Sequence, residues 1–378
     1  MPNFKEGSLG KDFAKDKLVE FKERIDKGQS FTVISMPGVG VSYFLKYLAM
    51  QPYARFFHID LYSLPTLTHQ EFYKLILTEL GGKPEKKSEE QLLVEIRETL
   101  AHLSSTSRDK IVLIFSRFDQ LKKVFYNQFL SNVQSLASVA EGKIVLIFTS
   151  TLPISQICNE PLEGGNINFY SEQLYFKPYL GEDLKKLLEL EPVRTISKDV
   201  LEGLIKLSGG HNQLLHILLR SHKQQNLILD QFVRLQLKGF IDYLDYTQRK
   251  DLQKIALGKH INEADEYLLG VGLVRNLKFK ISNLKFELFT PLLTEYIKLN
   301  TSVKLPVKEA KLFKLLRQNF GKIVSKDEIF KTVWPEDEAA TDWALDALIY
   351  RLRKHPFMKT HNYIIESQKK VGYILIQV

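Results

Sequence analysis

The stretch FTVISMPGVGVSYFLKYLAM, residues 31–50, decides how the first half of the chain folds. It begins with an apolar run suited to a buried strand, continues with Gly38 and Gly40, and ends in a helical pattern. A strand, a glycine-rich turn and a helix in this order form a cradle in which backbone N–H groups at a helix N-terminus hold phosphate. The stretch therefore predicts an α/β domain with a phosphate-binding loop.

Four further apolar runs follow this stretch, with helical patterns between them. Unbroken apolar runs are typical of strands buried on both faces, and strand–helix alternation indicates a parallel sheet with right-handed crossovers. Residues 1–178 are therefore predicted to form an α/β domain with a parallel sheet. The four runs are ARFFHIDL (54–61), KIVLIF (110–115), KIVLIFTS (143–150) and QLYFKP (173–178).

The strand signals stop after residue 178, and three more units are expected. Residues 179–235 have an all-helical pattern, in which LSGGHNQLLHILL indicates a helix, a tight turn and a second helix. Residues 236–300 end in a helix, a two-stranded alternation and a helix opened by Pro291, which is the order of a small winged helix. A last unit is expected at residues 301–378.

Composition limits the class of protein and its partners. The net charge is +9, and residues 301–378 hold 14 Lys+Arg against 9 Asp+Glu, whereas the other 300 residues hold 39 against 35. This concentration suggests an anionic partner for the last unit, most often nucleic acid, although a solvated basic face is equally compatible with it. The N-terminus lacks a secretory apolar region and no long apolar window occurs, so a cytoplasmic protein without a membrane partner is expected. Cys158 is alone, which excludes an internal disulfide and a cysteine-built metal site.

The predicted phosphate cradle lacks the charge that catalysis needs. When the P-loop pattern G-x-x-x-x-G-K-[ST] is laid on residues 35–42, Val41 stands at the lysine and Ser42 at the hydroxyl that binds Mg²⁺. Gly38 and Gly40 would still let the backbone approach a phosphate. The residue that would balance the charge of a γ-phosphate is missing.

The acids of a Walker B strand are missing as well. Ser116 and Arg117 directly follow the apolar run KIVLIF (110–115), where the Walker B acids would stand, and Asp119 comes two residues later. Arg117 is a candidate replacement for the missing P-loop lysine. Thr149 or Ser150, at the end of the run KIVLIFTS (143–150), is a candidate polar sensor. Phosphoryl transfer relies on positioning and charge stabilisation, so ATP hydrolysis is not expected and no enzyme activity is predicted.

The order and spacing of these motifs resemble the STAND class of AAA+-like signalling ATPases. In that class a helical lid with a Gly-x-Pro motif and then a winged helix follow the P-loop domain. Gly210, His211 and Asn212 stand at the Gly-x-Pro positions, with Asn212 in place of the proline that lies beside the adenine. The resemblance covers about residues 10–300. It implies a degenerate P-loop domain at 1–178, a lid at 179–235 and a winged-helix-like domain at 236–300.

Two alternatives remain open for this pocket. Either its glycines only form a tight turn and the pocket stays empty, or ATP or ADP binds weakly as a structural ligand or switch. A metal site is not predicted. The candidate nucleotide-binding residues are Gly38, Gly40, Ser42, Asp119 and Thr149.

Residues 305–378 carry the most specific pattern in the chain. It predicts a helix over 307–319, a second helix capped by Ser325 and Glu328, a third helix over 341–354, and a hairpin with a basic tip. The predicted apolar side of the third helix consists of Trp343, Leu345, Leu348, Ile349 and Leu352. Its predicted basic side consists of Tyr350, Arg351, Arg353 and Lys354.

These motifs resemble the OmpR/PhoB-type winged helix. Trp334 ends the second helix, LDALIYRLRK (345–354) matches the family form V-D-x-x-I-x-x-L-R-K, and Gly372 and Tyr373 close the hairpin. The resemblance implies a recognition helix in the major groove of double-stranded DNA and a hairpin tip on the adjacent minor groove or phosphates. The DNA-binding residues it implies are Tyr350, Arg351, Arg353, Lys354, Lys369 and Lys370.

General physics agrees with this assignment, since one helix fits a major groove and flanking Lys and Arg neutralise phosphates. Together the motifs predict a DNA-binding transcriptional regulator in which a catalytically degenerate STAND-like module presents a C-terminal winged helix. The alternatives are a nucleotide-binding signalling NTPase and a scaffold whose winged helix contacts protein. Protein partners or self-association are compatible with each of them.

Overall fold

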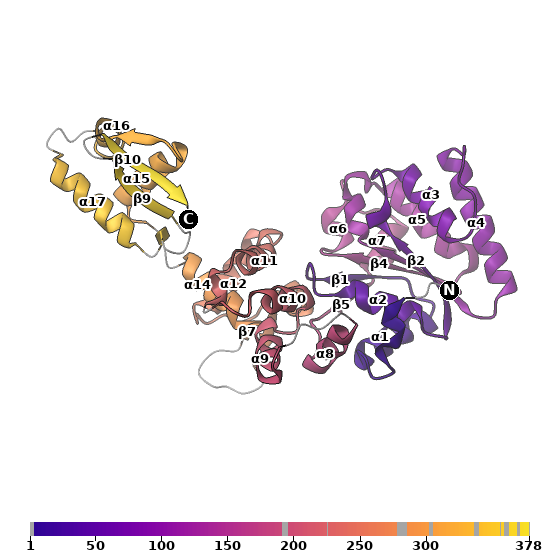
Figure 1. Ribbon diagram of the computed structural model, residues 1–378. Helices are drawn as coiled ribbons and strands as arrows, with labels where there is room; N and C mark the ends of the chain where they lie inside the picture. Colours follow the sequence, from indigo (N-terminus) through magenta and orange to yellow (C-terminus); the bar gives the residue numbers. More distant parts are fainter. Residues whose placement is uncertain are drawn as a thin grey trace.

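The structure is a computed structural model that describes residues 4–190, 196–224, 226–277, 286–301, 305–335, 340–355, 357–358, 363–368 and 371–377. Within these ranges the chain forms a five-stranded sheet with flanking helices, a helical part with a two-stranded sheet, and a C-terminal part with a three-stranded sheet (Figure 1). The predicted order of an α/β domain, helices and a terminal winged helix is confirmed.

The five strands of the large sheet are parallel and lie in the order β2-β3-β4-β1-β5. The loop-bearing strand β1 thus lies between β4 and β5, and Ile34 is opposite Ser150. Ligands of open parallel sheets bind beyond the carboxyl ends of the strands. The strands are β1 (Phe31–Ser35), β2 (Ala54–Asp60), β3 (Lys110–Ser116), β4 (Ile144–Ser150) and β5 (Gln173–Phe176).

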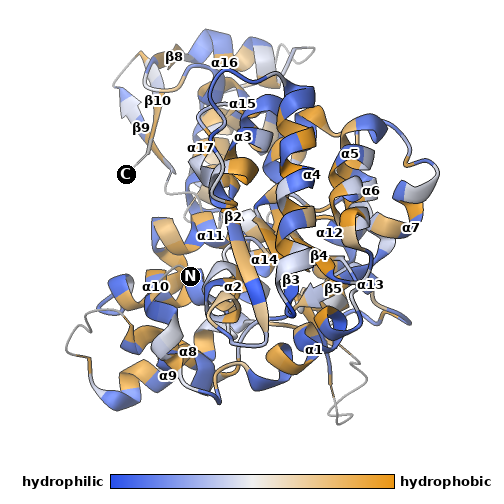
Figure 2. Cartoon of the chain, turned by 90° about the vertical axis from the view of Figure 1, so that its right-hand side faces the viewer, coloured by the Kyte–Doolittle hydropathy of each residue, from blue (hydrophilic) through white to orange (hydrophobic). Residues whose placement is uncertain are grey.

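Alternate side chains of the strands enter two separate hydrophobic cores, one on each face of the sheet. For example, Leu113 and Phe115 enter one core, and Val112 and Ile114 enter the other. Figure 2 shows the covering helices with both apolar and hydrophilic sides. The first core is covered by α3 (His69–Glu79), α4 (Glu89–Thr106), α5 (Asn127–Ala137), α6 (Ile154–Ile157) and α7 (Gly165–Ser171). The second is covered by α1 (Lys15–Asp26), α2 (Val41–Ala49) and the helices that follow β5.

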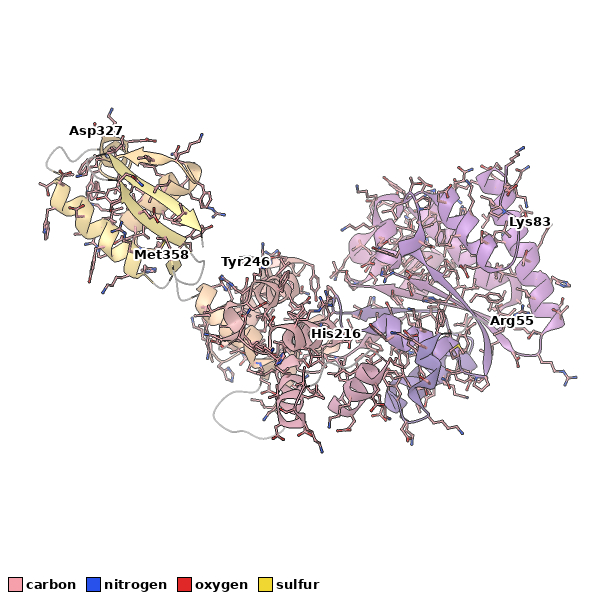
Figure 3. The ribbon with its side chains drawn as sticks, viewed as in Figure 1. Arg55, Lys83, His216, Tyr246, Asp327 and Met358 are labelled. Atoms are coloured by element: carbon pink, nitrogen blue, oxygen red, sulfur yellow. The ribbon has the colours of Figure 1, made fainter. Side chains whose placement is uncertain are left out.

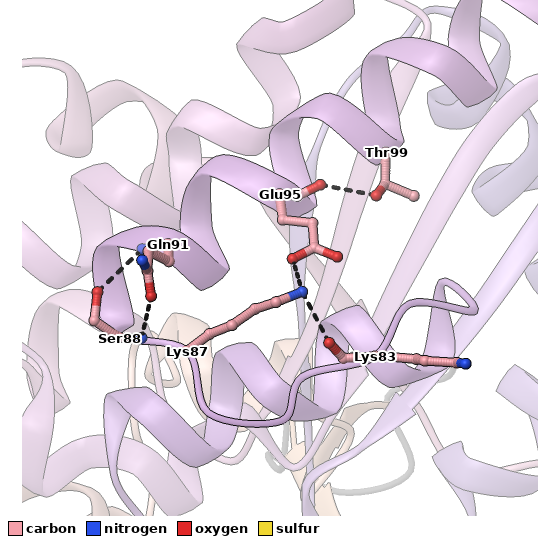
Figure 4. A network of polar contacts seen from close by, with 6 residues as sticks. All are labelled: Lys83, Lys87, Ser88, Gln91, Glu95 and Thr99. Carbon is pink, nitrogen blue, oxygen red and sulfur yellow. Dashed lines mark hydrogen bonds and ion pairs between the residues drawn. The ribbon is translucent and has the colours of Figure 1, made fainter.

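The charged connection between α3 and α4 is ordered by the start of α4 (Figure 4). Ser88 accepts from the Gln91 N–H, and the Gln91 side chain accepts from the Ser88 N–H, so the two residues form a capping box. Lys87 pairs with Glu95 and also donates to the Lys83 carbonyl at 2.9 Å. A lysine-rich loop is therefore held against a helix that carries acids in its first two turns.

The helices after β5 join the sheet in one continuous core. The expected tight turn between two helices is present, because Gly209 and Gly210 both have positive φ, 62° and 91°. The small two-stranded sheet is antiparallel. The elements are α8 (Gly181–Glu189), α9 (Lys198–Ser208), α10 (Asn212–Ser221), α11 (Gln231–Asp242), α12 (Tyr246–Ala256), α13 (Glu266–Gly270), β6 (Val274–Asn276), β7 (Phe286–Leu288) and α14 (Pro291–Thr301).

The C-terminal part has a core of its own. Ser325 caps its second helix by accepting from the Glu328 N–H at 3.2 Å. A short strand, β8, precedes that helix and was not expected from the sequence. The elements are α15 (Val307–Gln318), β8 (Ile323–Ser325), α16 (Lys326–Val333), α17 (Asp342–Lys354), β9 (Tyr363–Gln368) and β10 (Gly372–Gln377), with the sheet order β8-β10-β9.

Short 3₁₀ helices complete the chain at Lys5–Leu9, Leu61–Ser63, Phe118–Val124, Ser138–Ala140 and Leu227–Leu229. Among the described residues, no helix combines the length and the apolar character that a membrane crossing needs. The same residues contain no group of three or more His, Cys, Asp or Glu side chains placed to hold a metal.

Candidate functional sites

A cavity of about 780 Å³ opens at the carboxyl ends of β1, β3 and β4. The first N–H groups of a helix have no partner within it, and Val41 and Ser42, at the start of α2, line this cavity. The structure therefore brings the predicted nucleotide-site residues together from three segments of the chain. All five line the cavity: Gly38, Gly40, Ser42, Asp119 and Thr149.

Two of these five residues, Asp119 and Thr149, also hold the cavity wall through their side chains. The Thr149 hydroxyl accepts from the Arg117 N–H at 2.7 Å. The Asp119 carboxylate accepts from the backbone N–H and the hydroxyl of Thr151, at 3.0 and 2.8 Å. Both side chains therefore fix the loops that follow β3 and β4, whatever else they contact.

Arg117, the suggested replacement cation, lines the cavity, but its charge also has a partner within the chain. Its guanidinium pairs with Asp60 at the end of β2 and lies over the Tyr62 ring, 5.0 Å from the centroid. The backbone of Arg117 is left-handed, with φ 61°, which few non-glycine residues adopt. The positive charge is therefore matched by a carboxylate outside the phosphate loop.

The segment predicted to be the lid, residues 179–235, lies directly on the glycine loop through His211. His211 Nδ1 accepts from the Leu214 N–H at 3.2 Å, so the ring carries its proton on Nε2 and donates it to the Pro37 carbonyl at 2.9 Å. Complete burial lowers the pKa of this imidazole to about 4, although the bond to Pro37 raises it in part. A neutral histidine thus connects the lid to the loop.

Two further lid contacts close over the loop. The Gln213 N–H donates to the Gly38 carbonyl at 3.1 Å, and the Tyr179 hydroxyl donates to the Gly40 carbonyl at 2.8 Å. A Cβ atom on Gly38 would lie 1.9 Å from Gln213 Oε1. The two glycines are therefore required by the close approach of the lid as well as by their positive φ of 76° and 104°.

Several side chains of the cavity could not be found from sequence, because tertiary contacts alone bring them there. Figure 3 shows His216, one of them, where the lid meets the sheet. Nothing in their local sequence marks them as binding residues. They are Gln120, Lys122, Thr151, Gln213 and His216.

The second candidate site is the outward face of α17. Helical residues three, four and seven apart share one face, so Trp343, Ala347, Tyr350 and Lys354 form a line opposite the buried Leu352. Trp343 is 79% exposed. The prediction that it belongs to the apolar side is wrong, because its position in the first turn falls on the outward face. Trp334, by contrast, is buried as expected.

The two arginines predicted to contact DNA have partners within the C-terminal part. Arg351 Nε donates to Glu309 Oε1 at 2.8 Å, which connects α17 to α15. Arg353 donates from Nε to the Ile365 carbonyl at 2.8 Å and from Nη2 to the Ser367 hydroxyl at 2.7 Å. Both side chains remain on the surface, but they flank the outward line of α17.

The two acidic residues of α17, Asp342 and Asp346, both have partners within the C-terminal part. Asp342 pairs with Lys326 at 3.1 Å, and Asp346 accepts from the Tyr373 hydroxyl at 2.7 Å. Burial and this bond raise the pKa of Tyr373 to about 12. Lys354 lies over the Tyr350 ring, 5.1 Å from its centroid. The predicted contacts Lys369 and Lys370 fall outside the described residues.

Known proteins resemble parts of the chain. Residues 24–153 match the family described as "AAA domain", and residues 300–375 match the family described as "Transcriptional regulatory protein, C terminal". A comparison with curated proteins found no match.

Solved structures resemble the chain at the level of the fold. The ORC1 protein of Aeropyrum pernix in complex with DNA is 12% identical, with 96% of this chain and 87% of that chain covered and a TM-score of 0.42. A Walker-type ATPase of Pyrococcus abyssi is 13% identical, with coverages of 77% and 96% and a TM-score of 0.46. CDC6P from Pyrobaculum aerophilum is 15% identical, with coverages of 99% and 91% and a TM-score of 0.44. The chain thus combines an AAA-type P-loop domain with a C-terminal OmpR/PhoB-type winged helix.

Proposed function

We propose that this protein is a DNA-binding transcriptional regulator, in which a STAND-like body without catalytic charges presents the C-terminal winged helix to duplex DNA. The observation that carries the proposal is the exposed outward face of α17, in a unit that matches the C-terminal family of transcriptional regulatory proteins. A major groove accommodates one helix, and side chains on its outward face reach the base edges.

The electrostatics of the unit support this role. Residues 301–378 carry a surplus of positive charge, and the two acids of α17 are engaged with Lys326 and Tyr373. Lys354 continues the outward line and is placed for a phosphate contact. The bonds of Arg353 to β9 fix the hairpin against α17, so its role in our proposal is to position the hairpin. In this proposal the hairpin tip, where Lys369 and Lys370 are expected, would contact adjacent phosphates.

We propose further that the body senses rather than hydrolyses. The cavity retains the loop N–H groups and Ser42, but Val41 replaces the lysine and Arg117 is matched by Asp60. ATP or ADP bound there without turnover would lie against the lid, which contacts the loop through His211. A nucleotide or a protein partner would then change how the body presents α17.

A gel-shift series with pooled random duplexes at two salt concentrations tests the main proposal. We expect saturable binding by the full chain that weakens steeply with salt, because phosphate neutralisation releases counterions. Binding that does not exceed that of an acidic control protein, at both salt concentrations, would refute the proposal.

A second candidate function is a nucleotide-binding signalling NTPase, which the cavity itself favours. It gathers five candidate nucleotide-binding residues at the expected edge of the sheet. A radiolabelled ATP turnover assay distinguishes the two functions. Turnover that is abolished by Ser42→Ala would favour the NTPase, whereas the main proposal expects none.

A further inference from the structure

We infer that α17 recognises the 5-methyl groups of thymine in the major groove with an aromatic ridge, defined as Trp343, Ala347 and Tyr350. The inference rests on the proposed DNA binding and goes beyond it, because it names the base feature that is read.

The geometry of α17 places the aromatic ridge where bases would lie. With about 3.6 residues per turn, positions 343, 347 and 350 fall on one face across two turns. Leu345, Leu348 and Leu352 occupy the opposite side and are fully buried. Trp343 is 79% and Tyr350 is 58% exposed. Exposed apolar side chains that adjoin one another on one face mark an interaction site more often than single exposed residues do.

The polar groups beside the aromatic ridge already have partners. Guanine recognition by arginine needs a free guanidinium fork that reaches two acceptors. Arg351 uses Nε on Glu309, and Arg353 uses Nε and Nη2 on β9. Asp346 is held by Tyr373. The bond to Glu309 uses one of the five N–H donors of Arg351, and it holds the guanidinium beside the outward line. The centre of that line consists of Trp343, Ala347 and Tyr350.

Apolar side chains distinguish thymine by contact with its methyl group, and alanine and aromatic residues both make such contacts. Trp343 lies in the first turn of α17, and the N-terminal residues of recognition helices are those that contact base edges. The small side chain of Ala347 lets the helix axis come close to the groove floor. Tyr350 continues the contact one turn later, and Lys354 ends the line with a positive charge.

Charge complementarity favours DNA over a protein partner for this surface. Residues 301–378 carry a surplus of Lys and Arg, and Asp342 at the start of α17 pairs with Lys326. A hollow of about 550 Å³ runs beside the aromatic ridge between α17 and the β-sheet. Its lining includes Trp343, Tyr350 and Ser367. An anionic backbone next to an apolar base edge fits this arrangement.

The test uses duplexes selected from a random pool by the full chain. Each thymine of the selected site is replaced in turn by deoxyuridine, which removes the methyl group and leaves the hydrogen-bonding edge intact. Burial of one methyl-sized group corresponds to about a fourfold change in affinity. We expect a loss of about that size at one or two positions, measured by fluorescence anisotropy.

Trp343→Ala is the diagnostic variant, and Tyr246→Ala is its matched control. Tyr246 is 77% exposed and lies in the first turn of α12, as Trp343 lies in the first turn of α17. We expect Trp343→Ala to bind more weakly and to lose its sensitivity to deoxyuridine. We expect Tyr246→Ala to keep both affinity and sensitivity. Trp343→Phe, which keeps an apolar ring, should retain part of the sensitivity.

The outcomes separate this inference from the proposed function. Saturable binding without any effect of deoxyuridine would overturn the inference and leave DNA binding intact. The same holds if Trp343→Ala binds with unchanged affinity and unchanged sensitivity, in which case the aromatic ridge serves another partner. Failure of the wild-type chain to select any duplex would instead overturn the proposed function. Circular dichroism of each variant verifies that it is folded.

Discussion

Arg351 on the last turn of α17 donates Nε–H to Glu309 on the first turn of α15, with 2.8 Å between nitrogen and oxygen. The Glu309 carboxylate is nearly buried, whereas Arg351 is exposed. The bond therefore supports a carboxylate that water cannot reach, and it orients α17 against the rest of its unit. A buried acid without its partner is costly, because it loses both hydration and the ion pair.

Arg351→Ala should therefore destabilise the C-terminal unit. We expect its free energy of unfolding to fall by about 1–3 kcal/mol. Both tryptophans of the chain, Trp334 and Trp343, lie in this unit, so urea unfolding followed by tryptophan fluorescence reports it selectively. Arg317→Ala, an exposed arginine on α15, is the control and should leave the midpoint unchanged. Equal midpoints for the two variants would contradict the claim that the Arg351–Glu309 ion pair stabilises this unit.

Gly38→Ala should separate the lid from the glycine loop. The added methyl group would lie only 3.0 Å from Gln213 Cβ, and alanine at a φ of 76° is strained in itself. We expect the free energy of unfolding of the body to fall by about 1–3 kcal/mol. Unfolding followed by circular dichroism measures this loss. Gly258→Ala is a matched control with φ 68° and no neighbouring atom within 4 Å, so it shows the backbone strain alone. A loss no larger than that of the control would show that the lid does not press on Gly38.

The stability of the body should fall in mild acid because of His211. Its folded pKa of about 4 lies below the ordinary histidine pKa of 6.5, so between these values the unfolded chain binds a proton that the folded chain does not. Stability is then fully present above pH 6.5 and is lost as the pH falls toward 4. His58 contributes in the same direction, since burial lowers its pKa to about 4 as well.

His211→Gln should remove its share of this dependence, up to about 1.4 kcal/mol per pH unit. Urea unfolding at pH 5, 6 and 7 measures the slope. His102→Gln, on the exposed side of α4, is the control and should keep the wild-type slope. A His211→Gln variant with the wild-type slope would mean that the imidazole titrates alike in the folded and unfolded chains.

Val41→Lys should strengthen nucleotide binding. Val41 lines the cavity at the lysine position of the loop, and a lysine there would supply the charge that the phosphates lack. A charge-assisted hydrogen bond contributes about 1.5–3 kcal/mol, so we expect at least about a tenfold tighter Kd for ATP by isothermal titration calorimetry. Val94→Lys, on the exposed face of α4, is the control. No gain relative to that control would argue against a phosphate cradle.

The strands could be predicted from sequence because each inner strand is buried on both faces and therefore appears as an uninterrupted apolar run. The strand predicted at 110–115 corresponds to β3 (Lys110–Ser116), and the strand predicted at 143–150 corresponds to β4 (Ile144–Ser150). Helix ends are harder to predict, because residues 11–27 have helical spacing but α1 begins only at Lys15, after a left-handed Ala14. The strand β8 has three residues, which is too short for periodicity to reveal.

The candidate sites were predictable to different degrees. The loop glycines and Ser42 follow from spacing alone, but Gln213 reaches Gly38 only through the tertiary fold. Likewise, the basic residues at the end of α17 are visible in the sequence, whereas the partner of Arg351 lies on another helix. The apolar character of Trp343 predicts burial, but its angular position on α17 decides its exposure. Opposite the buried leucines, that position is outward.

The most direct test of the account reverses the charge at the end of the outward face of α17. Lys354→Glu and Lys250→Glu are matched, since each lysine lies over the ring of a tyrosine four residues before it. Duplex affinity of the full chain is measured against salt for both variants and for the wild type. We predict at least about a tenfold loss for Lys354→Glu and a salt slope smaller by about one phosphate contact, with Lys250→Glu unchanged. Equal affinity and equal slope for the two variants would contradict the claim that this face of α17 binds DNA.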